Sequence, residues 1–185
     1  MNHPEAPAEV LLIGGRAGAG KSTVGWEVSA RLRAVSVPHA IIEGDFMGQV
    51  HPAPEADPHR AHLTEANLTA IWSNYSRLGY RRLIYTNTVS VLPENAGMFI
   101  RAMGPDTRLI RVLLTATDAT TGERLAGREL GSEREQELQN SADKARLLNE
   151  RASADTVRVA TDGRTVPDIA VDVLAAAGWV AEMPS

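Results

Sequence analysis

Short runs of consecutive apolar residues recur along the chain, separated by longer stretches of mixed polarity. Such runs are typical of strands that are buried on both faces. They predict five strands, near residues 10–13, 39–43, 82–86, 109–114 and 156–160.

Between the strands, apolar side chains repeat at the spacing of one helix face. Local signals mark several helix ends: Gly79 closes one helix, Ser132 with Glu135 forms a capping-box pattern, and Thr165 with Asp168 caps another. The predicted helices cover residues 21–34, 63–78, 93–103, about 132–151 and the segment after 165.

The alternation of strands and helices predicts parallel βαβ units with right-handed crossovers. We therefore expect a three-layer α/β/α fold with about five parallel strands. A length of 185 residues suits one domain, residues 1–185. The proline-rich stretch 48–60 predicts a loop rather than a regular element.

Charge and composition exclude several functions. A net charge of −4 argues against a general nucleic-acid binder, and the absence of cysteine rules out disulfides and thiolate chemistry. No apolar run is long enough to span a bilayer, and the first residues do not resemble a secretory signal, so we expect a cytoplasmic protein. The loop 51–59 holds His, Glu and Asp, but a substrate-covering loop explains its prolines better than a metal site does.

The most specific feature is a complete phosphate-binding motif, G-x-x-x-x-G-K-[ST], between a predicted strand and a predicted helix. It reads Gly15-Arg16-Ala17-Gly18-Ala19-Gly20-Lys21-Ser22, and Thr23 follows. Glycines let successive backbone N–H groups face one concavity, and the positive end of the helix adds to the field. We expect Lys21 to reach the β- and γ-phosphates, Ser22 to ligate Mg²⁺ and Thr23 to contact the α-phosphate.

The phosphate loop does not by itself choose among kinase, motor, GTPase and regulatory ATPase. The third strand ends without the carboxylate that GTPases and large ATPases usually carry there. Acidic residues follow the second strand instead, as Glu43-Gly44-Asp45. Because the carboxyl ends of parallel strands open onto the ligand crevice, we expect Glu43 and Asp45 near the phosphates if the strand order places the second strand beside the phosphate loop.

These residues resemble the small P-loop kinases related to nucleoside monophosphate kinases: gluconate, shikimate and adenylylsulfate (APS) kinases and antibiotic phosphotransferases. Glu43-Gly44-Asp45 is similar to the Asp-Gly-Asp of the gluconate and adenylylsulfate kinases. The resemblance implies that Asp45 holds the acceptor hydroxyl and that Glu43 orients Mg²⁺ through water. Glutamate in place of the first aspartate is a departure from that pattern.

A second likeness is Glu123-Arg124-Leu125-Ala126-Gly127-Arg128, which resembles the lid of adenylate kinases. By that resemblance, Arg124 and Arg128 close over the transferring phosphoryl group, within a lid of about 117–135. The alternative is that both are surface arginines paired with neighbouring glutamates. The resemblance also places the segment 161–164 against the adenine ring.

The acceptor side is less clearly marked. The expected acceptor-binding segment covers about 46–80, joined by the end of the third strand. Arg60, Thr86 and Asn87 are the predicted substrate-binding residues, although turn formation explains Thr86 and Asn87 equally well. Weaker candidates are His62, Asn67 and Arg101. The chain lacks the AMP-binding sequences of adenylate kinases, so we expect another acceptor.

Taken together, the sequence predicts an ATP- and Mg²⁺-dependent phosphotransferase with Lys21, Asp45, Arg124 and Arg128 as its catalytic residues. Sugar acids, cyclitols, antibiotics and nucleosides remain open as acceptors. The choice between ATP and GTP, the oligomeric state, the strand order, and whether Glu43 or another acid orients Mg²⁺ also remain open. The alternative from another class is a regulatory or assembly ATPase that binds a macromolecule.

Overall fold

The computed structural model describes residues 6–126 and 134–180, apart from the side chains of residues 134–138. Five parallel strands form one sheet in the order β2-β3-β1-β4-β5. The strands are β1 (Glu9–Gly14), β2 (Ala40–Glu43), β3 (Arg82–Thr86), β4 (Arg108–Thr115) and β5 (Val157–Ala160). The fold class and the five parallel strands predicted from the sequence are confirmed.

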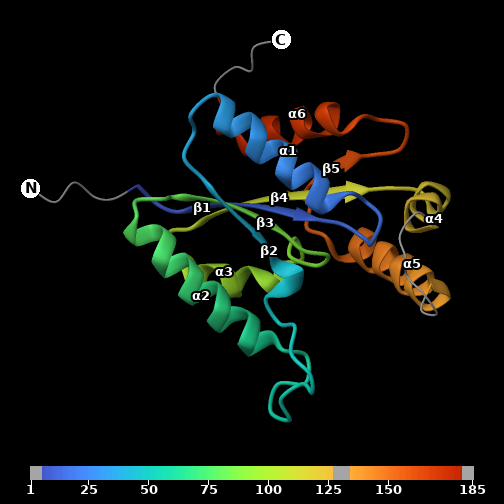
Figure 1. The fold of residues 1–185 in the computed structure, drawn as a ribbon, viewed down its shortest axis with the longest axis horizontal. Coiled ribbons are helices and arrows are strands. Elements are labelled where there is room, and N and C mark those ends of the chain that lie inside the picture. The colour runs from blue at the N-terminus through green and yellow to red at the C-terminus, as the bar shows by residue number, and fades with distance from the viewer. Residues whose placement is uncertain (1–5, 127–133, 181–185) are drawn as a thin grey trace, which may run out of the picture.

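Helices cover both faces of the sheet and make three layers (Figure 1). On one face lie α1 (Lys21–Ala34) and α6 (Val166–Ala177), and on the other lie α2 (Ala61–Arg77), α3 (Ala96–Met103) and α5 (Arg134–Arg151). The short helix α4 (Asp118–Ala126) follows β4. Of two 3₁₀ turns, η1 (Gly44–Phe46) follows β2 and η2 (Pro93–Asn95) precedes α3. The predicted capping-box residue Ser132 lies outside the described residues.

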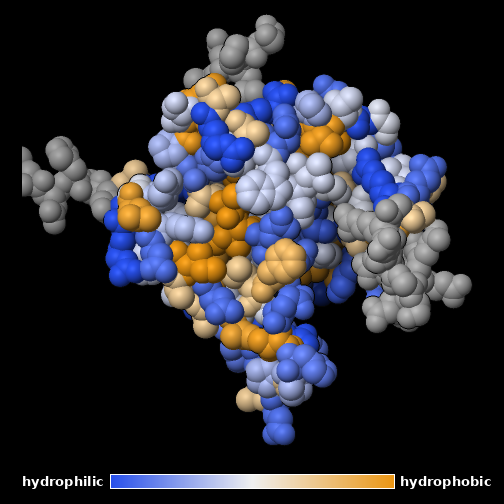
Figure 2. All heavy atoms as spheres, viewed as in Figure 1, coloured by the Kyte–Doolittle hydropathy of each residue, from blue (hydrophilic) through white to orange (hydrophobic). Residues whose placement is uncertain are grey.

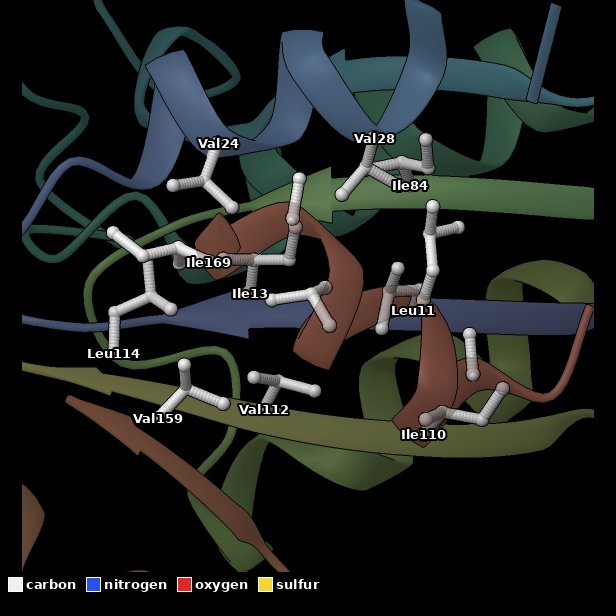
Figure 3. Close-up of a cluster of buried hydrophobic side chains, with 14 of the residues drawn as sticks. Leu11, Ile13, Val24, Val28, Ile84, Ile110, Val112, Leu114, Val159 and Ile169 are labelled. Atoms are coloured by element: carbon white, nitrogen blue, oxygen red, sulfur yellow. The ribbon is translucent and has the colours of Figure 1, made fainter. Parts of the chain in front are cut away.

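Alternation along the strands explains the two cores. In β1, Leu11 and Ile13 face α1 and α6, whereas Val10 and Leu12 face the opposite helices. Figure 3 shows the first core, where strand side chains pack against Val24 of α1. Because β1 is buried on both faces after Glu9, its sequence is a continuous apolar run from there on.

The strand β2 is one of the two edge strands of the sheet, and apart from the buried Ile42 its side chains are only partly covered. On the face shown in Figure 2 the surface is mostly polar, with an apolar band where β2 crosses the molecule beside α2. No helix within the described residues is long and apolar enough to cross a membrane.

All strands run in the same direction, so their carboxyl ends lie together at one end of the sheet, perpendicular to its edge strands. The loop after β1 leads into α1, η1 follows β2, and Asn87 follows β3. This end of the sheet therefore gathers the polar segments that the sequence marks as functional.

Candidate active site

The phosphate loop connects the end of β1 to the first turn of α1. Gly15, Gly18 and Gly20 have φ angles of 148°, 82° and 93°, which L side chains rarely adopt. At Gly15 an added Cβ would also come within 2.8 Å of the Leu114 carbonyl oxygen. The glycines are therefore required by the backbone path of the loop, before any ligand is considered.

A cavity of about 350 Å³ opens in front of this loop. Asp45, which follows β2, lines this cavity together with residues of the phosphate loop. The lining residues are Ala17, Gly18, Gly20, Lys21, Ser22, Thr23, Asp45, Gln49 and Thr88. Gly15, Arg16 and Ala19 belong to the loop but do not line the cavity.

Lys21 lies at the start of α1 with only 9% of its surface exposed. Its Nζ donates a hydrogen bond of 3.3 Å to the carbonyl oxygen of Arg16, across the loop. The ammonium group is thus held beside the N-terminal end of α1, where the helix dipole also favours an anion.

Ser22 and Glu43 meet beside the cavity. The Ser22 hydroxyl donates to Glu43 Oε2 at 2.9 Å, and the indole Nε1 of Trp26 donates to Glu43 Oε1 at 2.8 Å. A hydroxyl and a carboxylate are the hard oxygen ligands that Mg²⁺ prefers, and Mg²⁺ usually takes its other ligands from phosphates and water. The pair therefore fits a magnesium site. Across the described part of the chain, no three His, Asp or Glu residues cluster as a self-sufficient metal site.

Asp45 is held in place by Asn87, which follows the neighbouring strand β3. The Asn87 side-chain amide donates to Asp45 Oδ1 at 2.7 Å, while its own Oδ1 accepts from the Val89 backbone N–H at 3.0 Å. Asp45 is exposed, so its second carboxylate oxygen can accept a hydrogen bond from a molecule in the cavity. Beneath it, burial of Tyr85 raises the pKa of that phenol, and the negative charge of Asp45 adds to the effect.

The Arg16 side chain turns away from the cavity toward the helices that follow β4. It is 5% exposed, pairs with Asp118 of α4, and donates from Nε to the Ser141 hydroxyl of α5 at 2.8 Å. Ser141 in turn donates to the Ala17 carbonyl oxygen at 3.0 Å. Arg16, predicted to bind nucleotide, thus connects the phosphate loop to α4 and α5 through its side chain.

Arg124 of α4 bridges two loops at this end of the sheet. Its Nη1 donates to the Gly18 carbonyl oxygen at 3.2 Å and to Thr161 Oγ1 at 3.1 Å, and its Nη2 donates to the Thr161 carbonyl oxygen at 3.1 Å. Among the described residues these are the contacts of the Arg124 guanidinium, and Glu129 and Glu133, two of the glutamates in the alternative pairing, lie outside the described residues. The second predicted lid arginine, Arg128, lies outside the described residues.

The remaining predicted acceptor residues are placed differently from one another. Thr86 is 1% exposed and lies beneath α1, where a Cβ at Gly25 would come within 2.8 Å of its methyl group. Arg60 packs its aliphatic stem against Gly48, and its buried Nε has no hydrogen-bond partner among the described residues. Neither Thr86 nor Arg60 lines the cavity.

The weaker acceptor candidates are engaged in structural contacts or lie away from the cavity. Arg101 makes a two-point ion pair with Glu65, with both N–O distances at 2.7 Å. Asn67 donates to the Met47 carbonyl oxygen at 2.8 Å. His62 lines a groove between α2 and α3.

Several residues at the site were not predicted from the sequence. Gln49 lines the cavity and donates to the Asp45 carbonyl oxygen at 2.9 Å. Trp26 carried a readable signal, because it stands four residues after Ser22 and therefore on the same helix face. The role of Ser141 had no such signal, since α5 reaches the phosphate loop only in the folded chain.

Comparison with solved structures identifies similar folds at low identity. A gluconokinase from Sinorhizobium meliloti 1021 is 21% identical, with 95% of this chain and 94% of that chain covered and a TM-score of 0.58. The Mycobacterium tuberculosis APS kinase, solved with AMPPNP and APS, is 17% identical over 94% and 98% of the two chains, with a TM-score of 0.55.

A tunicamycin resistance protein from Deinococcus radiodurans is 18% identical, covers 91% of this chain and 94% of its own, and has a TM-score of 0.61. No family model matches the chain, and no curated protein matches it. The predicted resemblance is confirmed at the level of structure, because the chain shares the three-layer fold of P-loop kinases over nearly its whole length.

Proposed function

We propose that this protein is a small-molecule kinase that transfers the γ-phosphate of ATP to an acceptor hydroxyl in the presence of Mg²⁺. One observation carries the proposal: Lys21, Ser22 and Asp45 line the same cavity, although Asp45 comes from a different strand end. A phosphate-binding group and a carboxylate that can bind a hydroxyl therefore line one space that is open to small molecules.

In the proposed reaction the acceptor oxygen bonds to the γ-phosphorus while the bond from that phosphorus to the β,γ-bridging oxygen breaks, so ADP leaves. The acceptor proton passes to Asp45, whose orientation is fixed by Asn87. Lys21 and the loop N–H groups hold the phosphates in position. Bound Mg²⁺, held by Ser22 and Glu43, would neutralise charge on the phosphate oxygens.

Two further segments complete the proposed site. The lid, about 117–135, is proposed to bring Arg124 and Arg128 onto the phosphoryl group, and the segment about 46–80 to bind the acceptor. Arg60, Thr86 and Asn87 remain the proposed acceptor contacts. Arg60 is supported by a guanidinium Nε that no described residue satisfies, and Asn87 by its bond to Asp45. Thr86 would need α1, which covers it at Gly25, to move.

The compared structures support the substrate class. Two of them are named as kinases, a gluconokinase and an APS kinase that was solved with AMPPNP and APS. We propose that the present chain likewise uses ATP, acts on a small molecule other than AMP, and works in the cytoplasm, where ATP is available.

The test is ADP release measured across a panel of acceptors: sugar acids, cyclitols, aminoglycosides and other antibiotics, and nucleosides. We expect at least one class to stimulate ADP release well above the rate with ATP alone, with a phosphorylated product detectable by mass spectrometry. Slow hydrolysis that no acceptor stimulates, together with activity that depends on protein concentration, would favour the regulatory ATPase instead.

Asp45→Asn is the decisive variant. It keeps the shape of the side chain but removes the carboxylate, so transfer should fall by about two to four orders of magnitude while ATP affinity stays within a few-fold. Asp155→Asn is the matched control. Asp155 pairs with Arg111 and lies just before β5, at the amino end of that strand, whereas the cavity lies at the carboxyl ends of the strands. Normal turnover by Asp45→Asn would refute the assigned role.

A further inference from the structure

Trp26 is an unusual residue to find beside a phosphate site. It lies on α1, and 49% of its surface is exposed, so burial of the ring does not explain its position. Its Nε1 nevertheless makes a well-defined hydrogen bond of 2.8 Å to Glu43 Oε1. The contact joins the exposed face of α1 to the end of β2.

The Glu43 carboxylate receives one hydrogen bond on each oxygen. Oε2 accepts from the Ser22 hydroxyl at 2.9 Å, and Oε1 accepts from the Trp26 indole. Ser22 and Trp26 are one helical turn apart, so α1 presents both donors on the same side. A hydroxyl also has two lone pairs, and Ser22 can therefore donate to Glu43 and still ligate a cation.

Glutamate needs such support more than a shorter acid would. Its carboxylate is separated from the backbone by three rotatable bonds, and an unrestrained side chain at a strand end would occupy several rotamers. Two donors on separate oxygens leave one orientation of the carboxylate plane. The indole supplies the second donor from a rigid ring on a helix. In metal sites, hydrogen bonds of this kind from neighbouring residues hold the metal ligands in their orientation.

We propose that Trp26 is a positioning residue for the Mg²⁺ site: its indole N–H orients Glu43, and through it Ser22, toward the metal that accompanies the nucleotide. The inference rests on the proposed function, because it assumes that Ser22 and Glu43 hold Mg²⁺. It assigns no contact between Trp26 and the substrate.

The test measures binding of a non-hydrolysable ATP analogue by calorimetry, with Mg²⁺ and with EDTA. Trp26→Phe keeps an aromatic ring and deletes the N–H. We expect the factor by which Mg²⁺ tightens binding to fall about tenfold, the lower end for residues that support a metal ligand, because the indole is half exposed. Affinity in EDTA should be unchanged.

Two further readouts separate positioning from structure. In the kinase assay, Trp26→Phe should raise the Mg²⁺ concentration for half-maximal rate about tenfold and leave the rate at saturating Mg²⁺ near that of the wild type. Trp179→Phe is the matched control, because the buried Trp179 Nε1 has no hydrogen-bond partner among the described residues. This control should keep the full Mg²⁺ response.

Each outcome decides a separate point. In a Glu43→Ala background, Trp26→Phe should have no further effect, whereas independent and additive losses would overturn the coupling. If Mg²⁺ tightens binding of the analogue equally in the wild type and in Trp26→Phe, the proposed role of Trp26 is wrong, while the magnesium assignment stands. If Mg²⁺ does not change the affinity of the wild type for the analogue, the magnesium assignment in the proposed function is wrong, and so is this inference.

Discussion

Among single residues, Gly44 controls how the two acidic side chains of the site are presented. It is buried between Glu43 and Asp45, and a Cβ at this position would come within 2.2 Å of Tyr85 Cζ. Tyr85 is fixed by an edge-to-face contact with Phe99, at a centroid distance of 5.0 Å, so it cannot move aside freely.

We therefore expect Gly44→Ala to lower the free energy of unfolding by about 1–3 kcal/mol, as overpacking does, and to reduce transfer by moving Asp45. Thermal or denaturant unfolding measures the first effect, and the kinase assay measures the second. Gly122→Ala is the control: this α4 glycine has open space at its Cβ, and the change should leave stability equal or up to about 1 kcal/mol higher. A Gly44→Ala variant as stable as the wild type would contradict the packing argument.

Among the secondary-structure elements, α4 and α5 are connected to the phosphate loop by hydrogen bonds and an ion pair. Arg16 is the centre of this connection, and its side chain contacts Ser141 and Asp118 among the described residues. The partners differ in burial: Ser141 is 2% exposed, whereas the Asp118 side chain is 84% exposed. Loss of a buried partner leaves a guanidinium unsatisfied, whereas an exposed ion pair is replaced by water.

Ser141→Ala should therefore lower the free energy of unfolding by about 1–3 kcal/mol, and Asp118→Asn by about 0–1 kcal/mol. Hydrogen exchange checks the location of the effect, since amides of α4 and α5 should exchange faster in Ser141→Ala while those of β1 remain protected. Equal effects of the two substitutions would show that burial does not govern this connection.

For the whole molecule, the carboxylates make stability sensitive to acid. The Thr120 hydroxyl, together with the N–H and hydroxyl of Thr117, lowers the pKa of Asp162 to about 2. The Leu63 backbone N–H lowers the pKa of Asp57, and the Arg101 guanidinium lowers that of Glu65. Their ordinary values are 3.8 for aspartate and 4.5 for glutamate.

Because these pKa values are lower in the folded state, the unfolded chain binds protons first on acidification. Their contribution to stability is complete above about pH 5 and is lost as the pH falls through about 4 toward 2. We expect the free energy of unfolding to decline over that range, and Asp162→Asn to make the decline shallower. Urea unfolding at a series of pH values measures both, and an unchanged slope in Asp162→Asn would contradict the assignment.

Local sequence determined a large part of this protein. The central strands β1 and β3 were predictable because strands buried on both faces are predominantly apolar. The phosphate loop was predictable because its glycine positions are required by backbone angles that only glycine adopts readily, as at Gly18 and Gly20. Glu43 and Asp45 were predictable from their place at a strand end.

The tertiary structure decided which side chains meet. The sheet order puts β3 between β2 and β1, so Asn87 rather than a phosphate-loop residue holds Asp45. Strand alternation sends Thr86 to the same face as Ile84, beneath α1. Arg16 turns toward Ser141, 125 residues away along the chain. These pairings depend on packing between distant elements, and no local pattern of residues encodes them.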